Sequence, residues 1–323
     1  MNHIYSLYIC GMNPTKNNDN RAIAKMSIYD PPPERPSTLD CCGSGCVPCI
    51  LDVYEEEYSR WNRRQNCEGD QLRRDLLSIT KFKDYKIISF QELGNDVYMY
   101  TFAAIPLSKG RLPITDTQHV FVKSDGVIRP YTPVALSDNC SFDVIIKAYP
   151  NGKFTKLLLK KKINDIIFVR GPSGGIDYKG YESIVMFCAG TGIAAYLGLI
   201  RSILNNDKCD ILLKLHYSCK TLNGILMRKT LAEYSAYWNC TVFLYLTREN
   251  NWSLCSKSFW YNENISEGRI SHDIIEEIIN QQQSLQTLWL ICGNDEFNQF
   301  IFNELKIVNI KKDNIKIFHN NNK

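Results

Sequence analysis

Residues 185–193 read Val185-Met186-Phe187-Cys188-Ala189-Gly190-Thr191-Gly192-Ile193. The apolar run predicts a buried strand, and the Gly-Thr-Gly turn after it predicts a change of direction into a helix. In a doubly wound sheet, a glycine turn at this place leaves backbone N–H groups free for the diphosphate of a nucleotide. A single Gly-x-Gly turn is weak evidence, so the flanking sequence has to support it.

The chain after Tyr178 supports a doubly wound parallel sheet. Apolar strands are predicted at 184–189, 211–218, 241–246 and 288–292. Helices are predicted between them, up to residue 204, around 227–237, at 272–281 and up to about residue 308. This alternation predicts a nucleotide-binding α/β domain over residues 177–323.

The chain before this domain shows a different pattern, made mainly of short strands. Short strands are predicted at 85–90, 97–103, 119–122, 142–148 and 166–169, and turn residues such as Gly94-Asn95-Asp96 separate them. Regular short strands of this kind predict a small antiparallel barrel over residues 79–176.

The N-terminal part divides into a linker and a cysteine-rich module. Residues 1–36 are rich in asparagine and proline and cannot form a core. Residues 37–78 contain Cys41, Cys42, Cys46 and Cys49, followed by a predicted helix over 53–77. Four thiols at this spacing could hold zinc or an iron-sulfur cluster, or they could form a compact turn of reduced or disulfide-forming cysteines.

The composition excludes some classes of partner. The 38 basic and 34 acidic residues are mixed along 323 positions, so we expect no nucleic-acid binding. The 13 cysteines are an odd number and mostly scattered singly, which favours an intracellular compartment, cytoplasmic or mitochondrial. The apolar run 184–200 is short and interrupted by glycine, so we expect no membrane span. We also expect a monomer.

A group of polar and aromatic residues lies in the barrel segment, in the sequence Arg129-Pro130-Tyr131-Thr132-Pro133. The Arg129 guanidinium can donate two hydrogen bonds to a pyrophosphate, the Tyr131 ring can stack on a flat heterocycle, and the Thr132 hydroxyl can hydrogen-bond to a ring nitrogen. The alternative is an exposed turn with proline at its corners.

Two later segments are weaker signals. Lys147 and Tyr149 precede a turn at Gly152 that opens a predicted helix, where free N–H groups could meet a phosphate. Taken alone, a strand followed by a capped helix explains that stretch better. Likewise, the strand that ends in Cys292-Gly293 is, by itself, typical of ordinary core and turn.

The order of these motifs is more informative than any one of them. Residues 129–132 are followed by Lys147-x-Tyr149, by 152–155, by Arg170-Gly171-Pro172-Ser173-Gly174, and then by 190–193 and 292–293. Over residues 79–316 this series resembles the ferredoxin-NADP reductase superfamily, specifically its NADH-cytochrome b5 reductase branch. The proline run and cysteine cluster before it resemble the oxidoreductase-like N-terminal module.

The resemblance implies a Greek-key barrel that binds FAD. Arg129 would contact the pyrophosphate, Tyr131 would pack against the flavin, and Thr132 would lie by the reactive N5 atom. The other implied FAD contacts are Pro130, Lys147, Tyr149, Gly152, Lys153, Phe154 and Thr155.

In the second domain the resemblance implies that the dinucleotide meets Gly190, Thr191 and Gly192. Cys292 and Gly293 would border the nicotinamide ring. Thr132 and Cys292 would therefore be the residues nearest the hydride transfer.

The implied activity is transfer of hydride from NADH to FAD, and then of single electrons to a haem-protein acceptor such as cytochrome b5. Ala194, Ala195 and Asn294 depart from the usual motifs, which keeps open an alternative: a catalytically weak electron-transfer, assembly or metal-binding protein with the same fold. Gly224 stands where relatives carry an acid, with Lys220 and Arg228 nearby, so we expect weak discrimination against NADPH.

Overall fold

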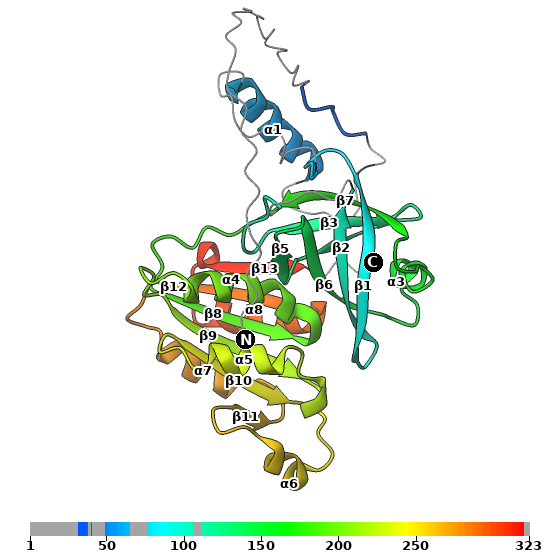
Figure 1. Ribbon diagram of the computed structural model, residues 1–323. Helices are drawn as coiled ribbons and strands as arrows, with labels where there is room; N and C mark the ends of the chain where they lie inside the picture. The colour runs from blue at the N-terminus through cyan, green and yellow to red at the C-terminus, as the bar shows by residue number, and fades with distance from the viewer. Residues whose placement is uncertain (1–31, 38–39, 41–48, 65–75, 106–111, 320–323) are drawn as a thin grey trace, which may run out of the picture. The chain divides into compact units, whose positions relative to one another are not determined.

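The computed structural model of the protein describes residues 32–37, 40, 49–64, 76–105 and 112–319 (Figure 1). Contacts between Cα atoms divide the chain into two units, Met1–Pro32 and Pro33–Lys323. The first unit lies almost wholly outside the described residues. All the elements below belong to the second unit.

Seven strands form an antiparallel sheet in the order β4-β3-β7-β1-β2-β6-β5 (Figure 1). They are β1 (Lys83–Gly94), β2 (Val97–Ala104), β3 (His119–Ser124), β4 (Val127–Tyr131), β5 (Ala135–Ser137), β6 (Ser141–Lys147) and β7 (Ile166–Ser173). One short helix, α3 (Lys153–Leu158), follows β6. The predicted antiparallel barrel is confirmed, although β4 and β5 were not among the predicted strands.

β4 carries the Arg-Pro-Tyr motif at one end of the sheet order. It pairs with β3 alone in the sheet, with Tyr131 opposite Val120 and Arg129 opposite Val122. An end strand tolerates Pro130 because the missing N–H is not needed for a second ladder. The alternative of an exposed turn is therefore wrong for residues 129–131.

Arg170 of β7 connects the barrel with the N-terminal module. Its side chain is buried, and the guanidinium carbon lies 4.8 Å from the ring centroids of both Phe82 and Phe121. Nη1 donates a hydrogen bond of 3.0 Å to the backbone carbonyl of Asp40. The Arg-Gly-Pro motif thus contacts the residue that directly precedes Cys41.

The second sheet has six parallel strands in the order β11-β10-β9-β8-β12-β13. They are β8 (Ser183–Ala189), β9 (Leu212–Cys219), β10 (Cys240–Leu246), β11 (Asn264–Glu267), β12 (Thr287–Gly293) and β13 (Ile315–His319). The helical segments are η2 (Gly190–Ile193), α4 (Ala194–Leu204), η3 (Leu222–Gly224), α5 (Arg228–Tyr234), α6 (Trp252–Cys255), η4 (Ser256–Ser258), α7 (His272–Asn280), α8 (Asp295–Ile307) and η5 (Lys312–Asn314).

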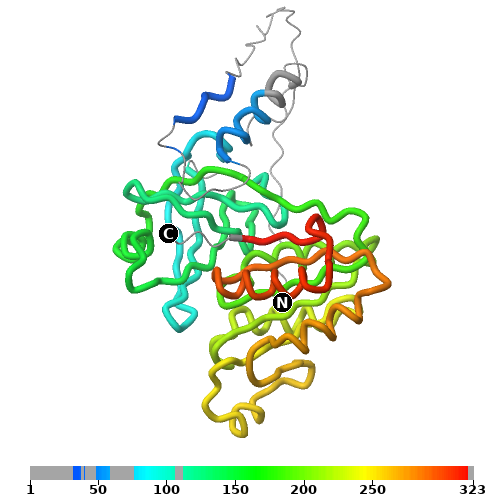
Figure 2. Tube along the Cα trace, turned by 180° about the vertical axis from the view of Figure 1, so that it is seen from behind, coloured from blue at the N-terminus to red at the C-terminus, as the bar shows by residue number. Residues whose placement is uncertain are grey.

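Alternate residues of β8 face opposite sides of this sheet. Ile184 and Met186 belong to a core cluster that includes residues of α4 and α5, whereas Val185 and Phe187 belong to a cluster that includes residues of α7 and α8. The helices α4 and α5 lie in front of the sheet in Figure 1, and α7 and α8 cover the face seen in Figure 2. The predicted doubly wound parallel sheet is confirmed.

The helix of the N-terminal module begins before the predicted start and does not include residues 76 and 77. α1 covers Ile50–Arg64, and Asp52 lies in its first turn, where it accepts a hydrogen bond of 3.1 Å from the Cys49 N–H. The predicted helix over 53–77 is wrong at its end, because Leu76 and Leu77 are buried and not helical. Among the residues described, no helix is long and apolar enough to cross a membrane.

Candidate cofactor-binding site

The end of β4 presents the first group of predicted site residues. The side chain of Tyr131 is half-buried, and its ring lies 5.6 Å from that of Phe154, the second residue of α3. Burial raises the pKa of Tyr131 above its usual range, and the charge of Arg129 opposes this only in part. Tyr131 is therefore a neutral phenol beside a cation, with an apolar ring behind it.

Arg129 lies two residues before Tyr131 on the same strand, so both side chains leave the same face of β4. Nη1 of Arg129 donates a hydrogen bond of 2.8 Å to the carbonyl of Ile128. Thr132, directly after the strand, is half-buried. The structure thus brings together cation, aromatic ring and hydroxyl at one strand end.

Gly152 caps the start of α3 without a capping side chain. A Cβ atom at position 152 would collide with Oγ1 of Thr155, which donates a hydrogen bond of 3.3 Å to the Gly152 carbonyl. Only glycine fits here without displacing Thr155. Lys153 is exposed at the first position of the helix, so its cation is free to reach solvent or a ligand.

Lys147 and Tyr149 form a second, more exposed pair. Nζ of Lys147 lies 5.6 Å from the ring centroid of Tyr149, which is 43% exposed. The Ala148 N–H between them donates to the Asp96 carbonyl at 2.7 Å, which fixes the backbone here. This pair therefore presents a cation and an aromatic ring near the surface.

In the parallel sheet, the glycine turn lies against the end of β12. Gly190 has φ +56°, a left-handed conformation that favours glycine, and opens η2. A Cβ atom on Gly192 would collide with the backbone carbonyl of Cys292. Because β8 is flanked by β9 and β12, these residues lie at the point where the strand order reverses, which is where such sheets bind ligands. Thr191 is half-buried at the same edge.

Cys292 is buried, and burial raises the pKa of its thiol to about 12. It is therefore a neutral thiol at physiological pH. Gly293 follows, where a Cβ atom would meet the ring of Phe297 at 2.5 Å. Asn294 accepts a hydrogen bond of 2.9 Å from the Phe297 N–H and so caps α8. The asparagine that departs from the usual motif thus preserves the helix start.

The two halves of the predicted site are joined by packing. Val134, just after the Arg-Pro-Tyr-Thr-Pro motif, shares a core cluster with Ile193 of η2. Its carbonyl accepts a hydrogen bond of 2.8 Å from Nη1 of Arg201 in α4. The loop after β4 and the helix after the glycine turn are therefore direct neighbours.

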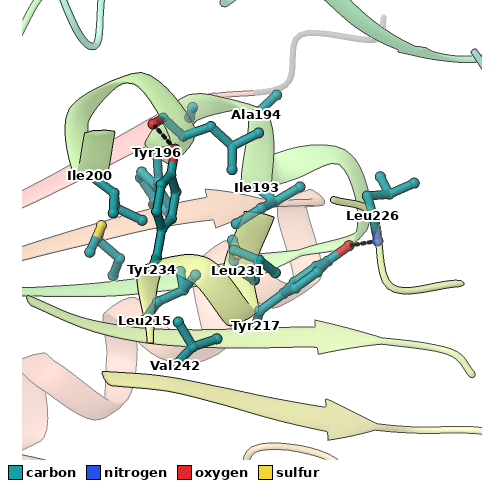
Figure 3. Packing of buried hydrophobic residues seen from close by; sticks show 14 of the residues in the cluster. Ile193, Ala194, Tyr196, Ile200, Leu215, Tyr217, Leu226, Leu231, Tyr234 and Val242 are labelled. Atoms are coloured by element: carbon teal, nitrogen blue, oxygen red, sulfur yellow. Dashed lines mark hydrogen bonds between the residues drawn. The ribbon is translucent and has the colours of Figure 1, made fainter. Parts of the chain in front are cut away.

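The segment after β9 folds back over the sheet. The Tyr217 hydroxyl accepts a hydrogen bond of 3.3 Å from the Leu226 N–H, in the apolar cluster that Figure 3 shows.

Arg228 donates two hydrogen bonds to the carboxylate of Glu263, and its guanidinium carbon lies 4.5 Å from the centroid of the Trp260 ring. The charge of Arg228 is therefore paired within the protein. Glu249, which the sequence interpretation missed, accepts a hydrogen bond of 2.9 Å from the Leu222 N–H.

The cysteine cluster falls mostly beyond the described residues. Cys41, Cys42 and Cys46 lie outside them, and Cys49 is half-buried before α1. In the described part of the chain, no group of three or more potential ligands could hold a metal ion. The predicted zinc or iron-sulfur site stays a prediction.

Comparison with known protein families agrees with the geometry. Residues 84–178 match the family described as "Oxidoreductase FAD-binding domain", 186–302 match "Oxidoreductase NAD-binding domain", and 27–68 match "Oxidoreductase-like protein, N-terminal". These matches, with the barrel and the doubly wound sheet, define an oxidoreductase with FAD-binding and NAD-binding domains.

Individual relatives narrow this class. The "NADH-cytochrome b5 reductase-like" protein of Homo sapiens is 28% identical, over 88% of this chain and 94% of the relative. The "NADH-cytochrome b5 reductase 1" of Lodderomyces elongisporus is 32% identical, over 48% of this chain and 54% of the relative. Among solved structures, the cytochrome b5 reductase domain of Ulva prolifera nitrate reductase shares the fold with TM-score 0.62 and 20% identity, over 76% of this chain and all of that one.

The protein is thus an FAD/NAD-binding oxidoreductase of the cytochrome b5 reductase family, and it carries the oxidoreductase-like N-terminal domain. The predicted resemblance is confirmed.

Proposed function

We propose that the protein transfers hydride from NADH to FAD and then passes single electrons to a haem-protein acceptor such as cytochrome b5. The observation that carries this proposal is the 2.8 Å hydrogen bond from Arg201 of α4 to the Val134 carbonyl, within a core cluster that includes both Val134 and Ile193. It joins the strand end proposed for the flavin to the glycine turn proposed for the dinucleotide.

The residues of the barrel fit FAD. Arg129 would bind the pyrophosphate, Tyr131 would pack on the flavin, and Thr132 would donate or accept a hydrogen bond at the flavin edge. The neutral, half-buried phenol of Tyr131 suits a flat heterocycle, and the glycine at 152 leaves backbone accessible beside Thr155. When bound, FAD supplies the ability to accept a hydride and release electrons one at a time. Lys147, Tyr149, Lys153 and Phe154 would complete the binding surface.

The second domain would orient NADH. Gly190, Thr191 and Gly192 would receive its diphosphate, because the turn leaves backbone close to the sheet edge. Cys292 and Gly293 would border the nicotinamide. A thiol that stays neutral adds no charge beside a ring that becomes positive when it loses hydride.

The acceptor site we propose is a lysine face beside α3. Lys153, Lys156, Lys160 and Lys162 are exposed there, and Lys161 pairs with Asp125 at 3.6 Å. Such a face would attract an acidic haem protein and speed its encounter with the flavin edge.

The test is a visible absorption spectrum followed by turnover with NADH. We expect a flavin spectrum, NADH oxidation with ferricyanide, and reduction of cytochrome b5. Flavin without turnover would favour the alternative of an electron-transfer or assembly protein that has kept the fold, as the substitutions at Ala194 and Ala195 suggest. Metal without flavin would favour a metal-binding role centred on the cysteine cluster.

A further inference from the structure

The ends of β9 and β10 remain paired beyond the last residues of both strands. The Thr247 N–H donates to the Cys219 carbonyl at 2.9 Å, and the Arg248 N–H donates to the Lys220 carbonyl at 2.8 Å. This extension carries the next residue, Glu249, over the end of the neighbouring strand β9.

The Glu249 carboxylate is fixed in this place. Oε2 accepts the 2.9 Å hydrogen bond from the N–H of Leu222, the first residue of η3. Burial, together with the charge of Glu249, raises the pKa of the Cys255 thiol. Burial, with a smaller contribution from the charge of Glu249, raises the pKa of Cys219 to about 12. The side chain of Glu249 is itself only half-buried. A negative charge is therefore held among neutral thiols, within reach of solvent.

An acid at the end of the second strand of a doubly wound sheet has a recognisable chemical role. It accepts hydrogen bonds from the hydroxyls of the adenosine ribose, and it repels a 2′-phosphate. Gly224, in the same segment, has no side chain for this role. The carboxylate of Glu249 reaches the segment from the third strand instead.

We propose that Glu249 is the residue by which this protein selects NADH over NADPH, through its hydrogen-bonded carboxylate at the Leu222 N–H. The proposal rests on the proposed function, because it assumes that the adenosine ribose lies at this sheet edge. It replaces the expectation of weak discrimination, which considered Gly224, Lys220 and Arg228 but not Glu249.

The neighbouring cations do not cancel this charge. Arg228 donates two hydrogen bonds to the Glu263 carboxylate and one of 2.8 Å to the Ser258 carbonyl. Lys220 and Arg248 are exposed, so solvent screens their charges more than that of Glu249. Lys220 is the group most able to oppose the selection.

The test is binding of two nucleotide fragments to the full-length, FAD-loaded protein: 5′-AMP, and 2′,5′-ADP, which carries the additional 2′-phosphate. Titration calorimetry measures both affinities without any turnover. We expect wild type to bind 5′-AMP more tightly. In Glu249→Gln, which keeps a hydrogen-bond acceptor but loses the charge, we expect the ratio of affinities to shift toward 2′,5′-ADP by at least about tenfold.

Two further variants control this result. Glu267→Gln removes an exposed acid at the same edge, at the end of β11, and should leave the ratio unchanged. Gly224→Asp added to Glu249→Gln should restore the preference for 5′-AMP. A Cβ atom at 224 would make only ordinary contacts, 3.4 Å from Oγ1 of Thr221 and 3.5 Å from Nδ2 of Asn95.

The outcomes separate the two proposals. If Glu249→Gln unfolds at the wild-type temperature and leaves the ratio of the two affinities unchanged, Glu249 only fixes the loop. That result would overturn the assignment. Binding of 5′-AMP with the expected shift but no oxidation of NADH would uphold the assignment and overturn the proposed activity. If wild type bound neither fragment, the nucleotide site and the role of Glu249 would both be rejected.

Discussion

The α-carbon of Gly192 lies against the backbone carbonyl of Cys292, so closely that a Cβ atom at position 192 would overlap the carbonyl group. The contact joins the turn after β8 to the carboxyl end of strand β12. Because both partners are backbone or glycine, neither can move aside as a flexible side chain could. This relationship fixes the edge at which we place the nicotinamide dinucleotide.

Gly192→Ala should therefore displace either the η2 turn or the end of β12. We expect the free energy of unfolding to fall by about 1–3 kcal/mol, as for overpacking in a core, together with a higher KM for NADH. Chemical denaturation and steady-state kinetics measure the two effects. Gly190→Ala is the comparison, because its Cβ atom would meet open space and the cost there, about 1–2 kcal/mol, comes from the positive φ alone.

Arg129→Ala should release FAD more than it disturbs the fold. The pyrophosphate would lose a charge-assisted, forked hydrogen bond. The ratio of flavin to protein absorbance after gel filtration measures retention, and circular dichroism checks the fold. Arg129→Lys should retain an intermediate amount of FAD. Full flavin content in a folded Arg129→Ala protein would remove Arg129 from the proposed site.

The lysine face should govern the reaction with cytochrome b5. We expect Lys156→Glu with Lys160→Glu to slow cytochrome b5 reduction severalfold at low salt, and the rate of wild type to fall as ionic strength rises. Lys312→Glu, an exposed lysine in η5 far along the chain, is the control. Equal rates for all three proteins would mean that the acceptor docks elsewhere.

Acid should destabilise the protein through His216. This side chain is buried between the rings of Phe187 and Phe243, and burial, with the charge of Lys214, lowers its pKa to about 3. The folded protein holds His216 neutral, whereas the unfolded chain binds a proton below about pH 6.5. Stability should therefore fall as pH decreases from 6.5 toward 3, by up to about 1.4 kcal/mol per pH unit.

The control for this prediction is His216→Phe, which keeps an aromatic ring in the stack and removes the titrating group. It also removes the partner of the Tyr245 hydroxyl, so its stability at neutral pH should be lower. Its slope of unfolding free energy against pH should nevertheless be smaller than that of wild type. Identical slopes would assign the acid sensitivity to other groups.

Much of the fold was predictable because its signals are local. The strand at 183–189 is apolar on both faces, as a central parallel strand requires, and the turn after it contains two glycines. β11 was missed because its four residues are mostly exposed and polar, which a strand at the sheet edge permits. β4 was missed because its proline and arginine interrupt the alternation of apolar and polar residues that predicts a strand.

The site was predictable where it consists of consecutive residues, and less so where it depends on tertiary contacts. Glu249 follows β10, and nothing near it in sequence places its carboxylate on Leu222. Arg228 carries a charge that looks available in the sequence, but Glu263 neutralises it from a loop later in the chain. Such pairings depend on strand order, which a local pattern does not contain.

The hydrogen bond from Arg170 to the Asp40 carbonyl has a consequence for how this chain can be divided. The N-terminal family match ends at residue 68 and the FAD-binding match begins at 84, which suggests a convenient place to cut. A fragment that begins there would lack one acceptor of Arg170, a residue that is 1% exposed and whose guanidinium lies between two phenylalanine rings. The two modules are separate in sequence, but expression and domain-exchange designs should treat them as one piece.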